Sequence, residues 1–455
     1  MFSDSQLPGI EKARLIERDQ HPISRKQISP NALKVLYKLE EAGYHAYLVG
    51  GGVRDLILGR QPKDFDIATE ATPAELKNLF RNARIIGRRF MIVHLRFGRE
   101  IIEVTTFRAH HQVQNQIGDD VSRRQIQGLD SAHSSDGMIL RDNVYGEIDE
   151  DALRRDFTIN ALYYTINKFR VLDFSTGIED LQAGQIRIIG DAEERYREDP
   201  VRMLRAIRFS AKLNFAIAPD TAGPISGLAH LLDSISPARL FDETLKLLSS
   251  GYAVDTFSLL REYNLSKQLF PDTLDAIEDD DLPASKLVGL ALRNTDDRLR
   301  AGKSVTPAFL FAALLWPALQ QNLRREKDGS SGNPYQLLQQ AANTVVIAQL
   351  QYTAVPKRFT IAAKEIWELQ LRLERRNRRS IESAYDHPRF RAAYDFLLLR
   401  EESGEELNDL GKWWTDYQVD NPKERSELVA AVAKPKRRRR RKRQSSERNS
   451  SDTPE

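Results

Sequence analysis

The spacing of apolar residues changes once along this chain, and that change limits the folds available to it. In ARIIGRRFMIVHLRFG (83–98) and REIIEVTTFRA (99–109), apolar and polar residues alternate, which predicts two strands joined at Gly98. From about residue 195 to 420 the apolar residues recur at helical spacing, as in DPVRMLRAIRFSAKL. Strands followed by a long run of helices predict an α+β protein, with a small mixed or antiparallel sheet domain followed by all-helical domains.

The 455 residues are enough for several domains. Residues 109–137 are rich in Gln, Ser, Asp and Gly, and they predict a mobile surface loop. In that loop His110 and His111 are possible metal ligands, although solvated surface positions explain them as well. The predicted parts are a polar N-terminal extension, a sheet domain, a first helical domain, a second helical domain and a basic disordered tail, over residues 1–29, 30–165, 166–270, 271–420 and 421–455.

Cysteine and membrane-spanning segments are both missing from the sequence. The lack of cysteine excludes disulfides, thiolate metal sites and cysteine nucleophiles. The N-terminal residues are polar and charged, without an apolar signal core. The most apolar stretch, residues 308–319, is too short to cross a bilayer and predicts a buried helix. We therefore expect a cytoplasmic protein without an integral membrane segment.

Positive charge is concentrated near the C-terminus. Nine of the ten residues in KPKRRRRRKR (434–443) are basic, so the formal net charge of +3 leaves the remainder of the chain at −6. A dense basic run after a mildly acidic body is typical of an arm that binds a polyanion such as nucleic acid. A solubilising tail and attraction to a membrane surface are the alternatives.

Two aspartates flank a phenylalanine in PKDFDIATEATP (62–73). In a strand, Asp64 and Asp66 would share one face about 7 Å apart, with Phe65 anchored in the core behind them. Two carboxylates held that close repel each other unless a cation lies between them, so the pair predicts a divalent metal site. A solvated loop is the alternative. The next residues predict a helix with Thr72 as its N-cap.

A glycine run precedes the aspartates by about ten residues, in LVGGGVRD (48–55). Glycines between a strand and a helix let the backbone approach a ligand closely, and exposed amides there can bind phosphate. Arg54 adds donors suited to phosphate oxygens. The run lacks the P-loop pattern. Together with the aspartates it predicts metal-assisted phosphoryl transfer, in which Mg²⁺ bridges the carboxylates and a triphosphate.

Four blocks together resemble the class II nucleotidyltransferases of the polymerase-beta superfamily, which comprise bacterial poly(A) polymerases and tRNA CCA-adding enzymes. The blocks are LVGGGVRDLILGRQPKDFDIAT (48–69), EVTTFR (103–108), RRDFTINALYY (154–164) and REDPVRMLRAIRF (197–209). The resemblance implies a catalytic head followed by helical neck and body domains. It also implies that an RNA 3′-hydroxyl attacks the α-phosphate of a nucleoside triphosphate and releases pyrophosphate.

The resemblance also assigns roles to residues. Asp64 and Asp66 match the metal-binding pair, and Asp156 matches the third acidic position. Glu103 is the other candidate for that third carboxylate, because the register of its strand cannot be fixed from the sequence; a salt-bridged strand glutamate is its alternative reading. The positions that match contacts to the triphosphate are Gly50, Gly51, Arg54 and Arg155.

The block EDPVRMLRAIR predicts how a base is chosen. Asp199 is expected as the N-cap of a helix that begins at Pro200, and Arg202 and Arg205 follow at intervals of three. A carboxylate accepts and a guanidinium donates, so such a pair suits the amino group and ring nitrogen of adenine or cytosine. Guanine and uracil present the wrong pattern. Helix capping and surface ion pairs are the alternatives.

The stretch IIGRRFMIVHLRFG resembles the poly(A) polymerase signature, through Arg88, Arg89, Phe90 and His94. We therefore predict a template-independent adenylyltransferase that uses ATP and Mg²⁺ to extend RNA 3′ ends. A tRNA CCA-adding enzyme is the second hypothesis, and a non-catalytic RNA-binding protein with a degenerate head is the third. Proteins of RNA degradation or RNA chaperoning are candidate partners, and we expect a monomer.

Overall fold

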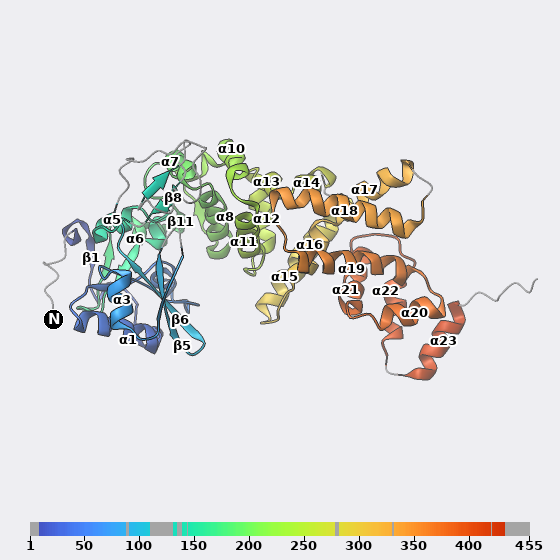
Figure 1. Cartoon of the computed structure of the whole chain (residues 1–455), viewed down its shortest axis with the longest axis horizontal. Helices are drawn as coiled ribbons and strands as arrows, with labels where there is room; N and C mark the ends of the chain where they lie inside the picture. The colour runs from blue at the N-terminus through green and yellow to red at the C-terminus, as the bar shows by residue number, and fades with distance from the viewer. Residues whose placement is uncertain are drawn as a thin grey trace, which may run out of the picture.

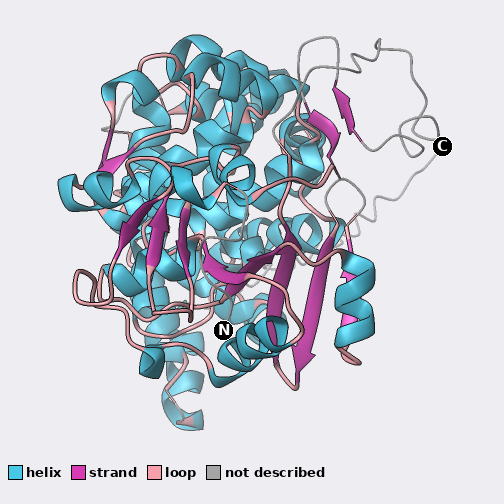
Figure 2. Cartoon of the chain, turned by 90° about the vertical axis from the view of Figure 1, so that its left-hand side faces the viewer, coloured by secondary structure: helices cyan, strands magenta, loops and turns pink. Residues whose placement is uncertain are grey.

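The sheet lies at one end of the molecule with helices α1, α3, α5 and α6 around it, and the later helices extend to the other end (Figure 1). Seen from the end that carries the sheet, the strands lie in front of the helices (Figure 2). This arrangement confirms the predicted α+β class, whereas the domain boundaries remain predictions. The computed structural model describes residues 9–87, 91–109, 131–133, 139–142, 144–277, 282–329, 332–419 and 421–432.

Eight strands form one mixed sheet in the order β1-β10-β9-β2-β3-β6-β5-β4. β3 and β6 run parallel, and the other neighbouring strands run antiparallel. The eight strands are β1 (Arg14–Ile16), β2 (Ala46–Val49), β3 (Asp66–Thr69), β4 (Ala83–Ile86), β5 (Ile92–Phe97), β6 (Glu100–Thr106), β9 (Leu162–Tyr164) and β10 (Val171–Asp173). Two small pairs are β7 (Ser131–His133) with β8 (Ile139–Asp142), and β11 (Gln185–Ile186) with β12 (Ala216–Ile217).

The prediction of a single strand over residues 83–98 is wrong, because this stretch forms both β4 and β5. Gly87 adopts a φ of 85°, which is outside the range of extended backbone and ends β4. The turn at Gly98, with a φ of 63°, joins β5 to β6 as expected. The extra strand places β5 between β4 and β6.

The helices around the sheet begin where the sequence signals place them. Thr72 and Glu75 form a capping box at the start of α3, which confirms Thr72 as an N-cap. The helices and 3-10 turns of this part are η2 (Ile10–Lys12), η3 (Arg25–Gln27), α1 (Pro30–Glu41), α2 (Gly51–Ile57), α3 (Pro73–Leu79), α5 (Ile148–Leu153), η4 (Thr158–Asn160) and α6 (Gly177–Ala183).

From Ala192 onward the structure is almost entirely helical, as predicted. The apolar stretch 308–319 is buried but forms two helices, α16 and α17, that meet at Leu315. The helices and turn are α7 (Ala192–Glu198), α8 (Val201–Leu213), α9 (Pro219–Ala222), α10 (Ile225–Leu228), η5 (Ala229–Ser234), α11 (Pro237–Leu248), α12 (Ala253–Glu262), α13 (Ser266–Leu269), α14 (Pro271–Ala276), α15 (Pro283–Arg300), α16 (Pro307–Leu314), α17 (Trp316–Gly329), α18 (Pro334–Tyr352), α19 (Lys357–Glu374), α20 (Arg378–Tyr385), α21 (Phe390–Glu402), α22 (Leu410–Tyr417) and α23 (Pro422–Val432). Among the described residues, none of these helices combines the length and apolar character needed to cross a membrane.

The central strands bury both of their faces. One face contributes Leu48, Ile67 and Val104 to an apolar cluster that continues from the sheet into the helices as far as Leu399. The opposite face contributes Tyr47, Val49 and Ala68 to a smaller cluster with Phe107, Ile148 and Tyr163. A second small core surrounds Trp414 near the C-terminus. The continuous cluster holds the sheet and α8 in a fixed relation, which positions the site described next.

Candidate active site

Polar side chains form a row across the second face of the sheet. Asp66, the first residue of β3, pairs with Glu103 of β6, and Glu103 pairs with His94 of β5. In the other direction Asp66 pairs with Val49 of β2, and Val49 pairs with Tyr163 of β9. Directly paired residues present their side chains on the same face of a sheet. Asp66 and Glu103 therefore lie side by side.

Asp64 lies just before β3 and is exposed, whereas Phe65 is buried, as predicted. The pair is thus formed by one loop residue and one strand residue, and not by two positions of a single strand. Burial, followed by the nearby carboxylates of Glu103 and Asp64, raises the pKa of Asp66 to about 6 against the opposing effect of Arg155. The negative charges around Asp66 are therefore poorly compensated by the protein itself.

Replacing Asp66 by Asn is expected to stabilise the fold at pH 8. Because the folded-state pKa of about 6 exceeds the ordinary value of 3.8, ionised Asp66 disfavours the folded state, fully above pH 6 and not at all below about pH 4. At about 1.4 kcal/mol per pKa unit, the gain is up to about 3 kcal/mol at pH 8 and shrinks at pH 5. Urea unfolding at both pH values measures it. A less stable Asp66→Asn variant at pH 8 would contradict the stated environment.

The donor set fits a divalent ion held partly by substrate. Among the described residues, no group of three or more His, Asp or Glu side chains is arranged closely enough to hold a metal ion. Mg²⁺ is usually held by one or two carboxylates together with substrate phosphates and water, so Asp64 and Asp66 are sufficient as protein ligands. A cation beside Asp66 would oppose the burial and the like charges that raise the pKa of this carboxyl.

The glycine turn brings the backbone close to this pair. Gly50 is the N-cap of α2 and has a φ of 71°, which favours glycine. A Cβ at Gly50 would lie 3.7 Å from Nη1 of Arg155 and 4.0 Å from Oδ2 of Asp66. The main chain at Gly50, the Arg155 guanidinium and the Asp66 carboxylate therefore surround one place. Gly51 begins α2 directly after it.

Arg155 is held in this position by two other groups. Its Nε donates to the Tyr163 hydroxyl at 2.7 Å, and its Nη2 donates to Oδ2 of Asp151 at 3.1 Å. Burial by itself would lower the pKa of Arg155, but Tyr163 and Asp151 raise it above its ordinary value. Arg155 therefore stays charged. Its Nη1, which lies nearest a Cβ built at Gly50, makes no hydrogen bond within the described part of the chain, so an anionic ligand could accept from it.

Arg54 is placed differently from what the sequence suggests for a phosphate contact. Its side chain is only 3% exposed, and Nε and Nη2 both donate to Oδ1 of Asp55, at 2.8 and 2.7 Å. Its Nη1 donates to Oδ1 of Asn160 at 2.7 Å. These contacts occupy three of the guanidinium donors. Arg54 thus fixes α2 against η4, directly beneath the glycine turn.

Asp156 lies among arginines. Its Oδ1 accepts from Nε of Arg202 at 2.9 Å, and its Oδ2 forms an ion pair with Nη1 of Arg205. Burial alone would raise the pKa of Asp156, but Arg205, Arg202 and Arg195 hold it well below the usual range. Of the two positions that the sequence left open for a third carboxylate, Glu103 is the one beside Asp66.

The prediction of Asp199 as an N-cap is wrong. Asp199 is the C-cap of α7, and Pro200 precedes α8 without a side-chain cap. The Asp199 carboxylate instead accepts from Nη2 of Arg239, on α11, at 2.7 Å through Oδ2. Within the described structure, Oδ1 of Asp199 and Nε of Arg205 are buried without a hydrogen-bond partner. One acceptor and one donor are therefore left for a ligand beside α8.

Sequence reasoning missed several residues of the site. Asp151 lies four residues before Arg155 on the same chain segment, and this spacing could have revealed the pair. Arg195 and Glu198 join Arg202 through a hydrogen bond to the Arg195 carbonyl oxygen and an ion pair with Glu198. Arg239 is 40 residues from its partner, and no local signal in the sequence points to it.

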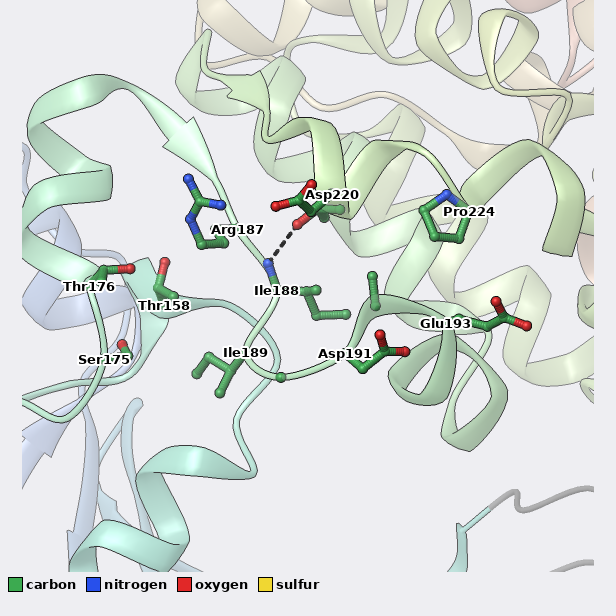
Figure 3. A pocket seen from close by; sticks show the side chains of 13 residues that line it. Thr158, Ser175, Thr176, Arg187, Ile188, Ile189, Asp191, Glu193, Asp220 and Pro224 are labelled. Atoms are coloured by element: carbon green, nitrogen blue, oxygen red, sulfur yellow. Dashed lines mark hydrogen bonds between the residues drawn. The ribbon is translucent and has the colours of Figure 1, made fainter.

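A separate cavity of about 590 Å³ lies between η4, α7 and α9, and Figure 3 shows its lining. Arg187 faces it together with Asp191, Glu193 and Asp220. Arg187 donates hydrogen bonds to Asp180 and Gln185, and the amide of Ile188 donates a hydrogen bond to the Thr221 hydroxyl oxygen. None of the carboxylates Asp64, Asp66 and Glu103 lines this cavity. It is therefore distinct from the row on the sheet.

Some predictions fall on residues that the structure does not describe. These are the histidines His110 and His111, the signature residues Arg88, Arg89 and Phe90, and the basic run 434–443. Most of the predicted loop 109–137 is also outside the described residues. Within that loop, β7 is a strand and pairs with β8.

Comparison with known families identifies three successive matches. The poly(A) polymerase head domain matches residues 46–187. A probable RNA- and SrmB-binding site of polymerase A matches residues 214–277, and the arginine-rich C-terminus of polymerase A matches residues 330–448. The matches thus follow the order of the sheet, the first helices and the later helices.

Curated relatives extend the similarity over most of the chain. Poly(A) polymerase I from Salmonella typhimurium is 50% identical over 418 residues, which cover 91% of this chain and 88% of the relative. Poly(A) polymerase I from Haemophilus influenzae is 45% identical over 419 residues, covering 91% and 90%. The chain belongs to the poly(A) polymerase family. This confirms the resemblance seen in the four sequence blocks.

CCA-adding enzymes match this member of the poly(A) polymerase family over a shorter stretch. A CCA-adding enzyme from Lactobacillus helveticus is 36% identical over 241 residues, which cover 53% of this chain and 55% of the relative. Sequence similarity to this poly(A) polymerase therefore covers about nine tenths of the chain, whereas sequence similarity to this CCA-adding enzyme covers about half of it.

Solved structures share the fold. A tRNA-processing enzyme in its apo form I has a TM-score of 0.56 at 21% identity, covering 92% of this chain and 98% of that one. The Thermotoga maritima CCA-adding enzyme complexed with tRNA has a TM-score of 0.53 at 18% identity, covering 92% and 99%. At these identities the likeness establishes the fold alone. It agrees with the nucleotidyltransferase fold implied by the sequence.

Proposed function

We propose that this member of the poly(A) polymerase family is a template-independent adenylyltransferase. It transfers AMP from ATP to RNA 3′ ends in the cytoplasm, with Mg²⁺ as cofactor. The observation that carries the proposal is the position of Asp66, where burial, Asp64 and Glu103 disfavour the ionised carboxylate. Such a site is stabilised by a cation, and Gly50 and Arg155 beside it suit the triphosphate that would accompany that cation.

The reaction joins the RNA 3′-oxygen to the α-phosphorus of ATP and breaks the bond between the α-phosphorus and the bridging oxygen. The hydroxyl proton passes to solvent, and pyrophosphate leaves with the electron pair of the broken bond. When bound, Mg²⁺ would neutralise phosphate charge and favour the deprotonated hydroxyl. Asp64 and Asp66 would hold it, and Glu103 is our candidate for the third carboxylate. Arg155 would bind phosphate oxygens through Nη1, because Tyr163 and Asp151 occupy its other donors.

Base selection is assigned to the start of α8. Adenine presents an amino donor at N6 beside an acceptor at N1. Asp199 has a buried oxygen and Arg205 a buried N–H that, within the described residues, have no partner. We infer that these groups, with Arg202 alongside, pair with the edge of the base. Arg202 is held by Asp156 and Glu198, so the reading surface is rigid.

The product ladder tests the proposed function. We expect an unstructured RNA primer, incubated with Mg²⁺ and one nucleotide at a time, to acquire a long homopolymer with ATP and little extension with CTP, GTP or UTP. Denaturing gel electrophoresis resolves the products. Extension that requires CTP and stops after two C and one A on tRNA would instead identify a CCA-adding enzyme. No extension with any nucleotide would favour the non-catalytic hypothesis.

A further inference from the structure

His94 and Glu103 make a contact that the proposed reaction does not yet use. The two residues are directly paired across β5 and β6, and Nε2 of His94 lies 3.1 Å from Oε1 of Glu103. Glu103 is in turn paired with Asp66 across β6 and β3. The three side chains therefore follow one another along one row, on the same face of the sheet.

The hydrogen bond fixes both partners. An ionised carboxylate only accepts hydrogen bonds, so Nε2 of His94 carries the hydrogen and donates it. This commits one oxygen of Glu103, and no other hydrogen bond to Glu103 is made within the described residues. The Glu103 side chain is 45% exposed and that of His94 is 24% exposed. A half-exposed glutamate without such a donor would sample several rotamers.

The location of the pair argues for a role beyond holding two strands together. Cross-strand pairs that only stabilise a sheet can occur at any position, whereas this one adjoins the half-buried carboxylate of Asp66. Carboxylates at metal sites are ordinarily hydrogen-bonded by a neighbouring group that fixes their orientation. Arg84 of β4 is the next residue along the row beyond His94.

We propose that His94 is a positioning residue that holds one oxygen of Glu103, so that the other faces the divalent cation held by Asp66 and Asp64. This inference rests on the proposed function, since the cation belongs to the phosphoryl-transfer site. Under this proposal, His94 of the poly(A) polymerase signature has a structural role at the site, and is more than a sequence marker of the family.

Two substitutions of His94 distinguish the effect of losing the Nε2 hydrogen-bond donor from the effect of losing the imidazole ring. Asn reproduces the reach of Nδ1 and is too short to replace Nε2, whereas Gln places an amide N–H near Nε2. We expect His94→Asn to weaken Mn²⁺ binding by about ten-fold or more, as is usual when an outer hydrogen-bonding partner of a metal site is lost, and His94→Gln to restore most of it. Electron paramagnetic resonance of free Mn²⁺, titrated into the full chain, measures the affinity without requiring catalysis.

A double-mutant cycle then tests whether His94 acts through Glu103. In a Glu103→Gln background, His94→Asn should cause little further loss. An equal loss in that background would overturn the proposal, and so would unchanged or tighter Mn²⁺ binding by His94→Asn alone. Circular dichroism confirms folding, and His94→Ala replaces His94→Asn if the latter does not fold. If the wild-type chain binds Mn²⁺ no better than Asp64→Ala/Asp66→Ala, the proposed metal site itself fails, which is a different outcome.

Discussion

The Asp64→Ala/Asp66→Ala variant is expected to lose adenylate transfer by at least about a thousand-fold in kcat. Phosphoryl transfer gains most of its rate from positioning and charge neutralisation, and loss of even one preorganised stabilising group costs about a hundred- to a thousand-fold. The effect should fall on kcat at saturating RNA. Incorporation of labelled ATP into an RNA primer measures it. The fold should survive, because Asp64 is exposed and ionised Asp66 is itself unfavourable.

The matched control is Glu41→Ala/Asp297→Ala. It removes the same two negative charges from exposed positions on α1 and α15, outside the three segments that match the family. We expect this variant to keep wild-type activity. If the Asp64→Ala/Asp66→Ala variant extends RNA at a rate close to that of the control, the two aspartates do not hold a required ion.

The Asp156→Asn variant is expected to lose stability at pH 7 by about 3–5 kcal/mol, the usual cost of breaking a buried ion pair. The substitution leaves Arg202 and Arg205 without their carboxylate. Because the folded-state pKa of Asp156 lies below its ordinary value of 3.8, the contribution is complete above about pH 4 and falls as the pH drops further. Thermal unfolding, followed by circular dichroism, measures the loss.

Asp191→Asn is the control, since Asp191 is an exposed N-cap where Asn serves equally well. Mn²⁺ binding separates the two roles considered for Asp156. If Asp156 is a partner of the α8 arginines, Asp156→Asn binds Mn²⁺ normally at a temperature where it is folded. A stable Asp156→Asn variant that has lost Mn²⁺ would make Asp156 the third carboxylate.

The part of the site that could be predicted from sequence is the part built by neighbouring residues. Gly50 and Asp66 are separated by 16 positions, and the short elements next to them, β2, α2 and β3, have clear apolar and glycine signals. Paired strands then bring the two together, as the register of Val49 with Asp66 shows. Local periodicity was sufficient here because few geometries connect elements of this length.

Contacts between distant segments could not be predicted in the same way. Asp156 was expected beside Asp66, but its preference for Arg202 and Arg205 depends on how α8 packs against the sheet domain, which no local pattern encodes. The N-cap signal at Asp199 was outweighed by an ion pair with Arg239, 40 residues away. The ion-pair partner of a charged side chain can be any residue that the tertiary structure brings near it. From the sequence alone, only partners a few residues away can be predicted.

Arg155 and Asp156 are consecutive, yet under the proposed function they would serve different halves of the nucleotide. Arg155 lies beside Gly50 and Asp66, while Asp156 forms ion pairs with the arginines of α8. Arg195 adds its own hydrogen bonds to the carbonyl oxygens of Arg154 and Arg155. A single peptide unit therefore connects the residues proposed to select the base with the residue proposed to bind the phosphates. A base that fits poorly and displaces α8 would also misalign the phosphates. We therefore expect an incorrect nucleotide to lower kcat as well as to bind with lower affinity.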